Sequence, residues 1–336
     1  MNTAKSLILM ATYNGEKYLD RQLQSIVSQS DPDWHLLIRD DGSKDGTIEI
    51  IRKYLSDDRI ELIVNDSDRH GAYRNFFSLI ENAKKREAYD YYFFADQDDE
   101  WLPDKLDVMT SAMKESEFAN SPLLAYSDMR VINQDDEVIH ESLHQVMGIG
   151  DIGKNSGSPF GIFYAHGFLW GCDTAFNRQL FEKLIPLDDR NEYINIVSHD
   201  NYVGKFATAF GHIEFVDRPC MNYRRHGDNT TGAYSMKLNP VKILKRGLLQ
   251  LNDLARVHAR VYTQSLIAIE QIKCAEDYAP AIDDIELSLK TGGIKGVKIL
   301  RKYHIKRKQK ARTFAIYFIM LFGLYKKWMW EKQLEK

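Results

Sequence analysis

The sequence is poor in cysteine and has no long apolar run. Its three cysteines, Cys172, Cys220 and Cys274, are widely spaced, which argues against a disulfide framework or a structural zinc site and favours a reducing compartment. The early apolar stretch at residues 7–11 is shorter than the ~7–15 residues of a signal-peptide core. No segment reaches the ~18 apolar residues of a membrane span. We therefore expect a cytoplasmic protein that does not cross a membrane by itself.

The sequence also lacks a glycine-rich phosphate-binding loop in the expected place, after a strand and before a helix. A Gly-x-Gly-x-x-Gly triplet occurs at Gly148, Gly150 and Gly153, but it follows no expected strand and opens no convincing helix. The loop after the first expected strand carries one glycine, Gly15, whereas the dinucleotide-binding turn needs three. No Gly-Lys-Ser/Thr loop occurs in the chain. Both observations disfavour ATPases and simple dehydrogenases. The overall composition, with 44% hydrophobic and 28% charged residues among 336, is typical of a folded protein and excludes disorder.

Acidic residues are missing from one long segment near the C-terminus. Residues 287–330 contain twelve Lys and Arg and no Asp or Glu, while residues 1–286 carry 31 basic and 46 acidic side chains. The formal net charge of −3 therefore hides an acidic body and a basic tail. This split predicts two tasks, the second of which faces an anionic surface.

Short apolar runs alternate with helical patterns over the first 130 residues. Repeated β-α-β units predict an α/β fold, with a mostly parallel central sheet and helices on both faces. Ligands of such sheets bind beyond the carboxyl ends of the strands. The expected strands are residues 6–10, 36–39, 60–64, 91–95 and 123–126, and the expected helices contain residues 19–27, 48–55 and 76–83.

The pattern loosens after residue 129. Helices are expected near residues 177–184 and 200–210, followed by a pair of strands, 213–216 and 221–225, on either side of Pro219. After Pro240 the chain is expected to form long helices. We therefore divide the sequence into a catalytic domain, 1–235, with halves of about 1–128 and 129–235, and a helical extension, 236–336.

Acidic residues directly follow two of the expected strands. Asp41 comes after the second strand, and Asp96, Asp98 and Asp99 come after the fourth. Closely spaced carboxylates repel one another unless a positive group lies among them. A divalent cation with oxygen ligands meets that need and could also neutralise a diphosphate of a substrate. The alternative is a solvated turn, which we favour for the other Asp doublets of the chain.

Two later groups are candidates for chemistry. Asp200, after Ser198 and His199, is placed either to act as a general base or simply to complement a helix N-terminus that Ser198 caps. Arg224 and His226 follow the last expected strand and could meet phosphate or metal, although a histidine in such a loop is more often a surface residue.

Taken in order, these motifs resemble the family 2 glycosyltransferases, and most of all the bacterial rhamnosyltransferases of cell-wall and capsular polysaccharide synthesis. The resemblance covers about residues 5–235. The motifs are Met10-Ala-Thr-Tyr-Asn-Gly15, Asp40-Asp-Gly-Ser43, Asp96-Gln-Asp-Asp-Glu-Trp101, Gly171-Cys172, His199-Asp200 and Tyr223-Arg-Arg-His-Gly227.

The resemblance implies a GT-A fold, a nucleotide-sugar donor, and Mg or Mn as cofactor. By motif position, Asp200 matches the base of an inverting transfer. The remaining matches are the donor-binding residues Thr12, Tyr13, Glu16, Asp41, Arg74, Asn75 and Asp96, the metal ligands Asp96, Asp98 and His226, and the further site residues Asp99, Trp101, His199 and Arg224.

The resemblance suggests dTDP-β-L-rhamnose as donor and a lipid-linked saccharide as acceptor. A UDP-sugar donor, carrying glucose, galactose or N-acetylglucosamine, remains an alternative, as does a sugar-binding scaffold without activity. A nucleotidyltransferase is less consistent with the Ala-Thr-Tyr-Asn-Gly loop after the first strand. The residues at 173–176 depart from the family pattern after Gly-Cys, which leaves the acceptor side less defined.

The basic tail lies outside the resemblance. Basic residues at 301–312 precede an apolar helix pattern at 314–325, and Lys326, Lys327 and two tryptophans follow. This arrangement predicts a peripheral contact of residues 290–330 with an anionic membrane on its cytoplasmic side. The alternative is a helix that packs on the core or on a second copy in a homo-oligomer. We expect no nucleic acid as partner, because no aromatic-lined basic groove is evident.

Overall fold

A computed structural model describes residues 6–147, 158–165, 169–226 and 240–330. Contacts divide the chain into two compact units, the first within residues 1–147 and 169–225 and the second within 148–168 and 226–336. The boundary expected at residue 235 falls among residues outside the described ranges, so it stays a prediction. None of the described helices is both long and apolar enough to span a membrane.

The first unit is an α/β structure whose elements follow the predicted order over its first half. Its elements are β1 (Ser6–Thr12), α1 (Leu19–Val27), β2 (Trp34–Asp40), α2 (Thr47–Arg52), β3 (Ile60–Val64), α3 (Ala72–Lys84), β4 (Tyr91–Ala95), β5 (Glu100–Trp101), α4 (Lys105–Glu115), β6 (Leu123–Ile132), β7 (Val138–His140), α5 (Leu143–Met147), η2 (Gly171–Asp173), β8 (Thr174–Asn177), α7 (Arg178–Lys183), η3 (Ile194–Ile196), α8 (His199–Phe210) and β9 (His212–Arg224).

One nine-stranded sheet runs through this unit in the order β3-β2-β1-β4-β8-β6-β9-β5, with β7 beside β6. The pairs β3–β2, β2–β1, β1–β4 and β6–β9 are parallel, and β8 pairs antiparallel with both β4 and β6. Strands β1 to β4, β6 and β9 therefore all point the same way. The prediction of a mostly parallel sheet is confirmed, and the carboxyl ends of β1, β2 and β4 lie side by side.

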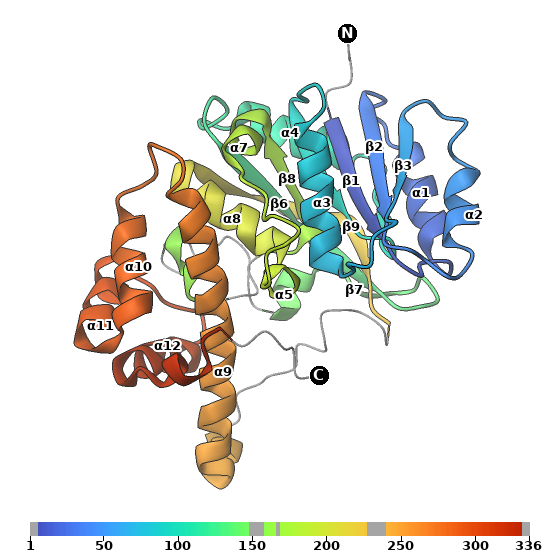
Figure 1. Ribbon diagram of the computed structural model, residues 1–336. Helices are drawn as coiled ribbons and strands as arrows, with labels where there is room; N and C mark the ends of the chain where they lie inside the picture. Colours follow the sequence, from blue (N-terminus) through green and yellow to red (C-terminus); the bar gives the residue numbers. More distant parts are fainter. Residues whose placement is uncertain (1–5, 148–157, 166–168, 227–239, 331–336) are drawn as a thin grey trace. The chain divides into compact units, whose positions relative to one another are not determined.

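Helices cover both faces of the sheet (Figure 1). Neighbouring residues of β4 point to opposite faces, as the pleat requires. Phe94 meets the ring of Phe76 on α3 at 5.4 Å, whereas Phe93 meets Trp101 at 5.9 Å on the other face. On the first of these faces α3 also packs against α8, where Phe77 contacts Tyr202. Aromatic packing thus fixes the layers that frame the end of β4.

The prediction of two strands around Pro219 is wrong. Residues 212–224 form a single strand, β9, which pairs with β6 in two stretches whose register shifts between Ser127 and Arg130. The proline lacks a backbone N–H and is accommodated where the register shifts, so it does not end the strand. The continuity carries the chain from the sheet centre to the acidic loop after β4.

The second unit is helical. Its rings pack tightly, since Tyr262 contacts both Tyr164 and Tyr325, and Tyr164 shares a 2.6 Å hydrogen bond with Ser288. The long helices expected after Pro240 are present. The elements are η1 (Pro159–Phe163), α9 (Pro240–Ile272), α10 (Ala281–Thr291), α11 (Gly293–Lys302), α12 (Lys310–Phe322) and η4 (Leu324–Trp328).

Candidate active site

The acidic loop that follows β4 is held by hydrogen bonds to two of its carbonyls and to the Asp99 carboxylate. The end of β9 supplies most of the contacts, since Arg224 donates from its backbone N–H to Asp99 Oδ1 at 3.0 Å and from Nε to the carbonyl of Asp98 at 2.9 Å. Its guanidinium also bonds the carboxylate of Asp136. From α1, Gln22 donates to the carbonyl of Asp96 at 2.9 Å. Arg224, a predicted site residue, is thus fully buried and fixes the loop.

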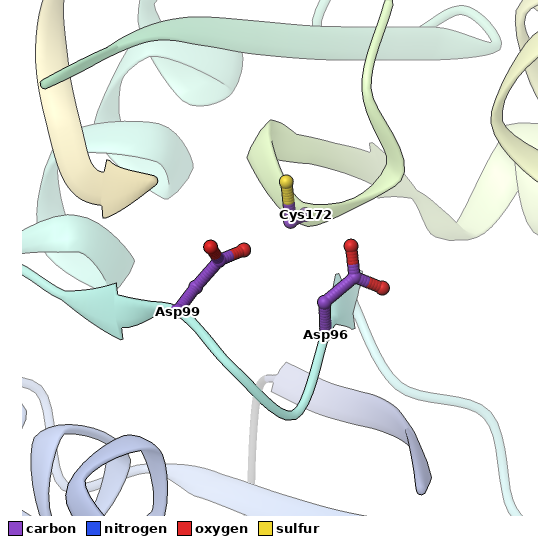
Figure 2. Close-up of side chains that lie close together, drawn as sticks. All are labelled: Asp96, Asp99 and Cys172. Carbon is purple, nitrogen blue, oxygen red and sulfur yellow. The ribbon is translucent and has the colours of Figure 1, made fainter. Parts of the chain in front are cut away.

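Asp96 and Asp99 converge on the thiol of Cys172. One carboxylate oxygen of each and the Cys172 sulfur all lie within 4.8 Å of one another (Figure 2). Cys172 belongs to η2, so residues far apart in the sequence meet at the end of β4. Asp99 Oδ2 is buried and accepts no hydrogen bond from the described residues. The cluster therefore has oxygen ligands in place for a cation.

The electrostatics of this cluster favour a positive charge. Burial, followed by the charges of Asp98 and Asp200, raises the pKa of Asp96 to about 7. Burial and the charges of Asp98 and Asp96 raise the pKa of Asp99 well above its ordinary value. Burial also raises the pKa of the Cys172 thiol. Each of these groups is costly to ionise alone, and a divalent cation would favour its ionised form.

The composition of this cluster fits Mg or Mn. Carboxylates suit both cations, and a thiol is a softer ligand that Mn accepts more readily than Mg. Of the expected ligands, Asp96 lies in the cluster, and Asp98 lies close enough to raise the pKa values of Asp96 and Asp99. His226 belongs to the second unit, so its role as a metal ligand stays a prediction.

A buried lysine beside the cluster was missed by sequence reasoning. Lys105 on α4 is fully buried, donates to the carbonyl of Cys172 at 2.6 Å and lies 4.3 Å above the ring of Trp101. Burial lowers its pKa, and the nearby Cys172 and Asp173 oppose that change. The sequence did contain a pattern that predicts burial of this lysine, because Lys105 lies one helical turn before Met109 on the apolar face of α4.

The carboxyl ends of β1 and β2 are joined through Asp40. Its carboxylate accepts from Thr12 Oγ1 at 2.9 Å and from Ser43 Oγ at 2.6 Å, and it also accepts from the backbone N–H of Gly42. Gly42 has a φ of +83°, which a residue with a side chain rarely adopts. Thr12, expected to line the donor pocket, is buried and serves this turn.

Asp41 and Asn75, two further expected donor residues, are buried and attach neighbouring segments to the sheet. Asp41 accepts from the backbone N–H of Gly71 at 2.8 Å and from Asn65 Nδ2 at 2.8 Å. Asn75 donates to the carbonyl of Arg39 at 2.9 Å. The structure thus brings Asp41 and Asn75 to the ends of β1 and β2, where they shape the loops.

Arg74 points elsewhere, toward the loop before η3. Its guanidinium forms an ion pair with Asp189 at 2.5 Å. The same carboxylate pairs with Arg69 at 2.9 Å, and these two arginines lower the pKa of Asp189 against the opposing effect of burial. Arg74 therefore ties the start of α3 to that loop.

Tyr13 and Glu16 lie on the loop after β1. The side chain of Tyr13 is 52% exposed, while its backbone N–H and carbonyl are both bonded by the side-chain amide of Gln97, at 2.8 and 2.9 Å. Glu16 accepts from the backbone N–H of Gly46 at 2.8 Å. Gln97 thereby couples the loop after β1 to the acidic loop after β4, and it leaves the Tyr13 ring open to solvent.

Asp200 lies in the first turn of α8. Its Oδ1 accepts from the backbone N–H of Asn201 at 2.6 Å, whereas its Oδ2 accepts no hydrogen bond from the described residues. The charge of Asp200 contributes to the raised pKa of Asp96. Ser198 occupies the N-cap position, but its side chain makes no capping bond. Asp200 therefore has one carboxylate oxygen that accepts nothing from the described residues, and its charge acts on the cluster.

His199 is a packing residue in this structure. Its ring stacks on Phe76 at 3.7 Å and meets Phe94 edge-on at 4.7 Å. Burial lowers its pKa to about 4, so the ring is neutral at pH 7. A Cβ on Gly171 would lie 2.3 Å from His199 Nε2, which explains the glycine of the Gly171-Cys172 motif. His199 thus sets the position of Cys172 through Gly171.

Comparisons with known proteins agree with this geometry. The family model "Glycosyl transferase family 2" matches residues 7–185. A dTDP-rhamnosyl transferase of Shigella flexneri, RfbG, is 31% identical over 232 residues, covering 67% of this chain and 74% of that protein. An Escherichia coli protein, WfgD, described as a UDP-Glc:alpha-D-GlcNAc-diphosphoundecaprenol beta-1,3-glucosyltransferase, is 28% identical and covers 81% and 95%.

The fold has a solved counterpart. The crystal structure of residues 1–349 of TarS from S. aureus, in complex with UDP, superimposes with a TM-score of 0.53 at 13% identity and covers 96% of this chain and 91% of that one. The likeness supports the GT-A fold. From the family match and the rhamnosyltransferase relative together, we conclude that the chain belongs to glycosyl transferase family 2 and is a glycosyltransferase.

Proposed function

We propose that the protein transfers L-rhamnose from dTDP-β-L-rhamnose to a hydroxyl of a lipid-linked saccharide, with inversion, in cell-surface polysaccharide synthesis. The observation that carries this proposal is the acidic cluster of Asp96, Asp99 and Cys172, on which the charge of Asp200 acts, at the strand ends of a family 2 chain. The rhamnose donor is supported by the relative from Shigella flexneri. The lipid-linked acceptor is supported by the diphosphoundecaprenol-dependent relative from Escherichia coli.

Asp200 is the proposed general base. Its Oδ2, which accepts nothing from the described residues, can accept the proton of the acceptor hydroxyl while the hydroxyl oxygen attacks the anomeric carbon. Asp200 lies in the first turn of α8, where the positive end of the helix dipole favours a negative charge, so we propose that it accepts the proton only as the new bond forms. The attack comes from the face opposite the nucleotide, and an L-rhamnosyl donor of β configuration then gives an α-L-rhamnoside.

Asp96, Asp99 and Cys172 would hold Mg or Mn, with Asp98 and His226 as the other proposed ligands. A divalent cation there would offset the negative charge that develops on the leaving diphosphate. The chain's own contribution is to hold the carboxylates in place, through the bonds of Arg224 to the Asp99 carboxylate and to the carbonyl of Asp98.

The donor nucleotide is proposed to lie on the loops after β1 and β2. The exposed ring of Tyr13 can stack on the base, and Gln97 fixes the backbone on which that ring stands. Thr12, Asp41 and Asn75 shape the pocket from beneath, since all three are buried and bonded to neighbouring segments. Glu16 and Arg74 would border it.

A UDP-sugar is the second candidate donor, because the Escherichia coli relative uses UDP-Glc and aligns with a larger share of this chain. Purified protein with Mn should be incubated with dTDP-rhamnose, UDP-glucose, UDP-galactose or UDP-N-acetylglucosamine, and nucleoside diphosphate release measured. Release from dTDP-rhamnose alone is expected. Release from a UDP-sugar instead would reassign the donor, and release from none would support a scaffold without activity.

Asp200→Asn tests the base in the same assay. The variant should lose transfer while it binds dTDP with an affinity close to that of the parent, because Asp200 lies on the acceptor side of the reaction. Normal turnover by this variant would exclude Asp200 as the base and leave the donor assignment standing.

A further inference from the structure

The exposed face of α12 is the most unusual surface of the second unit. Phe314 and Phe322 are 68% and 61% exposed, and Phe318 between them contacts both rings, at 5.8 and 4.7 Å. The three phenylalanines recur every four residues and so form one stripe along the helix. Leu321, 42% exposed, widens it. We call these four side chains the aromatic stripe.

The aromatic stripe is not the face by which α12 packs within its own unit. The opposite face of α12 is buried through Ala315, Ile316, Ile319 and Met320, and the Met320 side chain fills the space beside Gly296 of α11. The helix is therefore already anchored within its own unit, next to α11 (Figure 1). Its outer face exposes large apolar side chains in a row, which marks an interaction site rather than scattered surface residues.

Basic residues stand at both ends of the stripe. Lys306, Lys308 and Lys310 precede it, and Lys326 and Lys327 follow it, and all five are exposed. None of the first three forms an ion pair with any residue that the structure describes. Because residues 287–330 contain no Asp or Glu, no acidic side chain of this segment offsets that charge.

We propose that α12 lies flat in the surface of an anionic lipid membrane, with the aromatic stripe inserted and the flanking lysines on the lipid headgroups. Thirteen residues of helix are about 20 Å long. An apolar face of this kind inserts about 5–10 Å, into the boundary between headgroups and acyl chains. Membrane binding through α12 would bring the enzyme to the place where a lipid-linked acceptor resides. The proposal does not depend on the identity of the donor or on the activity.

Charge decides between a membrane and a second copy of this chain. In a two-fold dimer through the stripe, the lysines of each copy would face the same surface of the other copy, which repels. Anionic headgroups instead attract them, by about 5-fold in affinity for each lysine near the surface. The described contacts thus favour lipid as the occupant.

The test is binding of the full chain to vesicles, followed by flotation. Vesicles of phosphatidylglycerol and phosphatidylcholine should bind the protein, and vesicles of phosphatidylcholine alone should bind it at least 10-fold less. The variant Phe314→Ser/Phe322→Ser should lose at least 10-fold in affinity. A Lys306→Glu/Lys308→Glu/Lys310→Glu variant should lose about 100-fold or more, from about 5-fold per lysine.

Matched controls carry equal changes on the first unit. Val138→Ser/Ile139→Ser alters two residues of β7 that are 46% and 45% exposed, and a triple Lys→Glu change serves for charge. Both controls should bind vesicles like the parent. The three lysines of the charge control, all exposed, are Lys53, Lys85 and Lys114.

Circular dichroism and nucleoside diphosphate release should be unchanged in both the Phe→Ser and the Lys→Glu variant. This result distinguishes loss of the membrane-binding surface from loss of the fold. Equal vesicle binding by the parent and the stripe variants would overturn the proposal. So would absence of vesicle binding together with a concentration-dependent dimer, measured by sedimentation, that Phe314→Ser/Phe322→Ser abolishes.

Discussion

Asp96→Asn should stabilise the metal-free protein, and increasingly so as pH rises. The pKa of this carboxyl is raised from 3.8 to about 7 in the folded chain, mainly by burial. Below pH 4 both the folded and the unfolded chain hold the proton, so the carboxyl has no effect. Between pH 4 and 7 the unfolded chain releases a proton that the folded chain keeps, and the free energy of unfolding falls with pH.

At 1.36 kcal/mol for each pH unit, this carboxyl costs about 4 kcal/mol of stability by pH 7. Asparagine has nearly the same shape and no charge, so the variant escapes that cost. The difference in unfolding free energy between variant and parent should therefore grow from near zero at pH 4 to about 4 kcal/mol at pH 7. Above pH 7 the folded carboxyl of the parent is ionised too, and the difference should not fall, because the charge of Asp96 also opposes ionisation of Asp99.

The assay is urea denaturation at half-unit steps from pH 4 to 8, after treatment with EDTA. Buried histidines add their own pH dependence, since burial lowers the pKa of both His199 and His258 to about 4. That contribution is present in parent and variant alike and cancels in the difference. Asp58→Asn, at an exposed carboxylate outside the cluster, is the matched control and should follow the parent at every pH.

Manganese provides the second arm of this experiment. At a concentration 100 times its dissociation constant, Mn should raise the stability of the parent by about 2.7 kcal/mol at pH 7. It should raise that of Asp96→Asn far less, because one ligand is gone. Two results would refute the reasoning that a cation relieves the burial and repulsion of these carboxylates. One is a difference in unfolding free energy between variant and parent that does not change with pH, and the other is equal stabilisation of both proteins by Mn.

Two further substitutions test the frame of the site. Lys105→Met removes the buried lysine that lies among the acidic groups and should lower the free energy of unfolding in urea by about 3–5 kcal/mol. Lys114→Met, at an exposed position of the same helix, should lower it by less than about 0.5 kcal/mol. Equal effects of the two substitutions would contradict this role of Lys105. Gly171→Ala places a methyl 2.3 Å from His199 Nε2 and should lower stability by about 1–3 kcal/mol. In a His199→Ala background, Gly171→Ala should be nearly neutral. If the two changes instead lower the thermal stability by the sum of their separate effects, the clash between the methyl and His199 is ruled out.

The strands in the parallel half of the sheet could be predicted from local sequence, although β3 at its edge is only partly buried. The predicted strand at residues 91–95 coincides with β4 (Tyr91–Ala95) and the one at 60–64 with β3 (Ile60–Val64), since each is a short apolar run with a polar end. The continuous β9 was missed because Pro219 normally ends a strand, and only pairing with β6 shows where the register absorbs it.

The candidate site was predictable where its residues follow strands and not where they arrive from elsewhere. Asp96 and Asp99 directly follow β4, so the parallel topology alone places them on the ligand side. Cys172 reaches them from η2, 73 positions beyond Asp99, and no local pattern announces that approach. Lys105 could have been noticed on the apolar face of α4, but its partner, the carbonyl of Cys172, becomes visible only in three dimensions.

The way this site is held explains why Asp99 Oδ2 has no hydrogen-bond donor among the described residues. Arg224 is fully buried and could have neutralised a carboxylate of the cluster, yet its side chain bonds the carbonyl of Asp98 and the distant carboxylate of Asp136. Gln22 likewise donates to the carbonyl of Asp96. The donors fix the path of the loop, and Asp99 Oδ2 is left without a hydrogen bond from the described residues. A loop held in this way keeps its carboxylates in place in the absence of a cation, so binding need not first order the loop, and the cost appears instead as the pH-dependent instability that Asp96→Asn should remove.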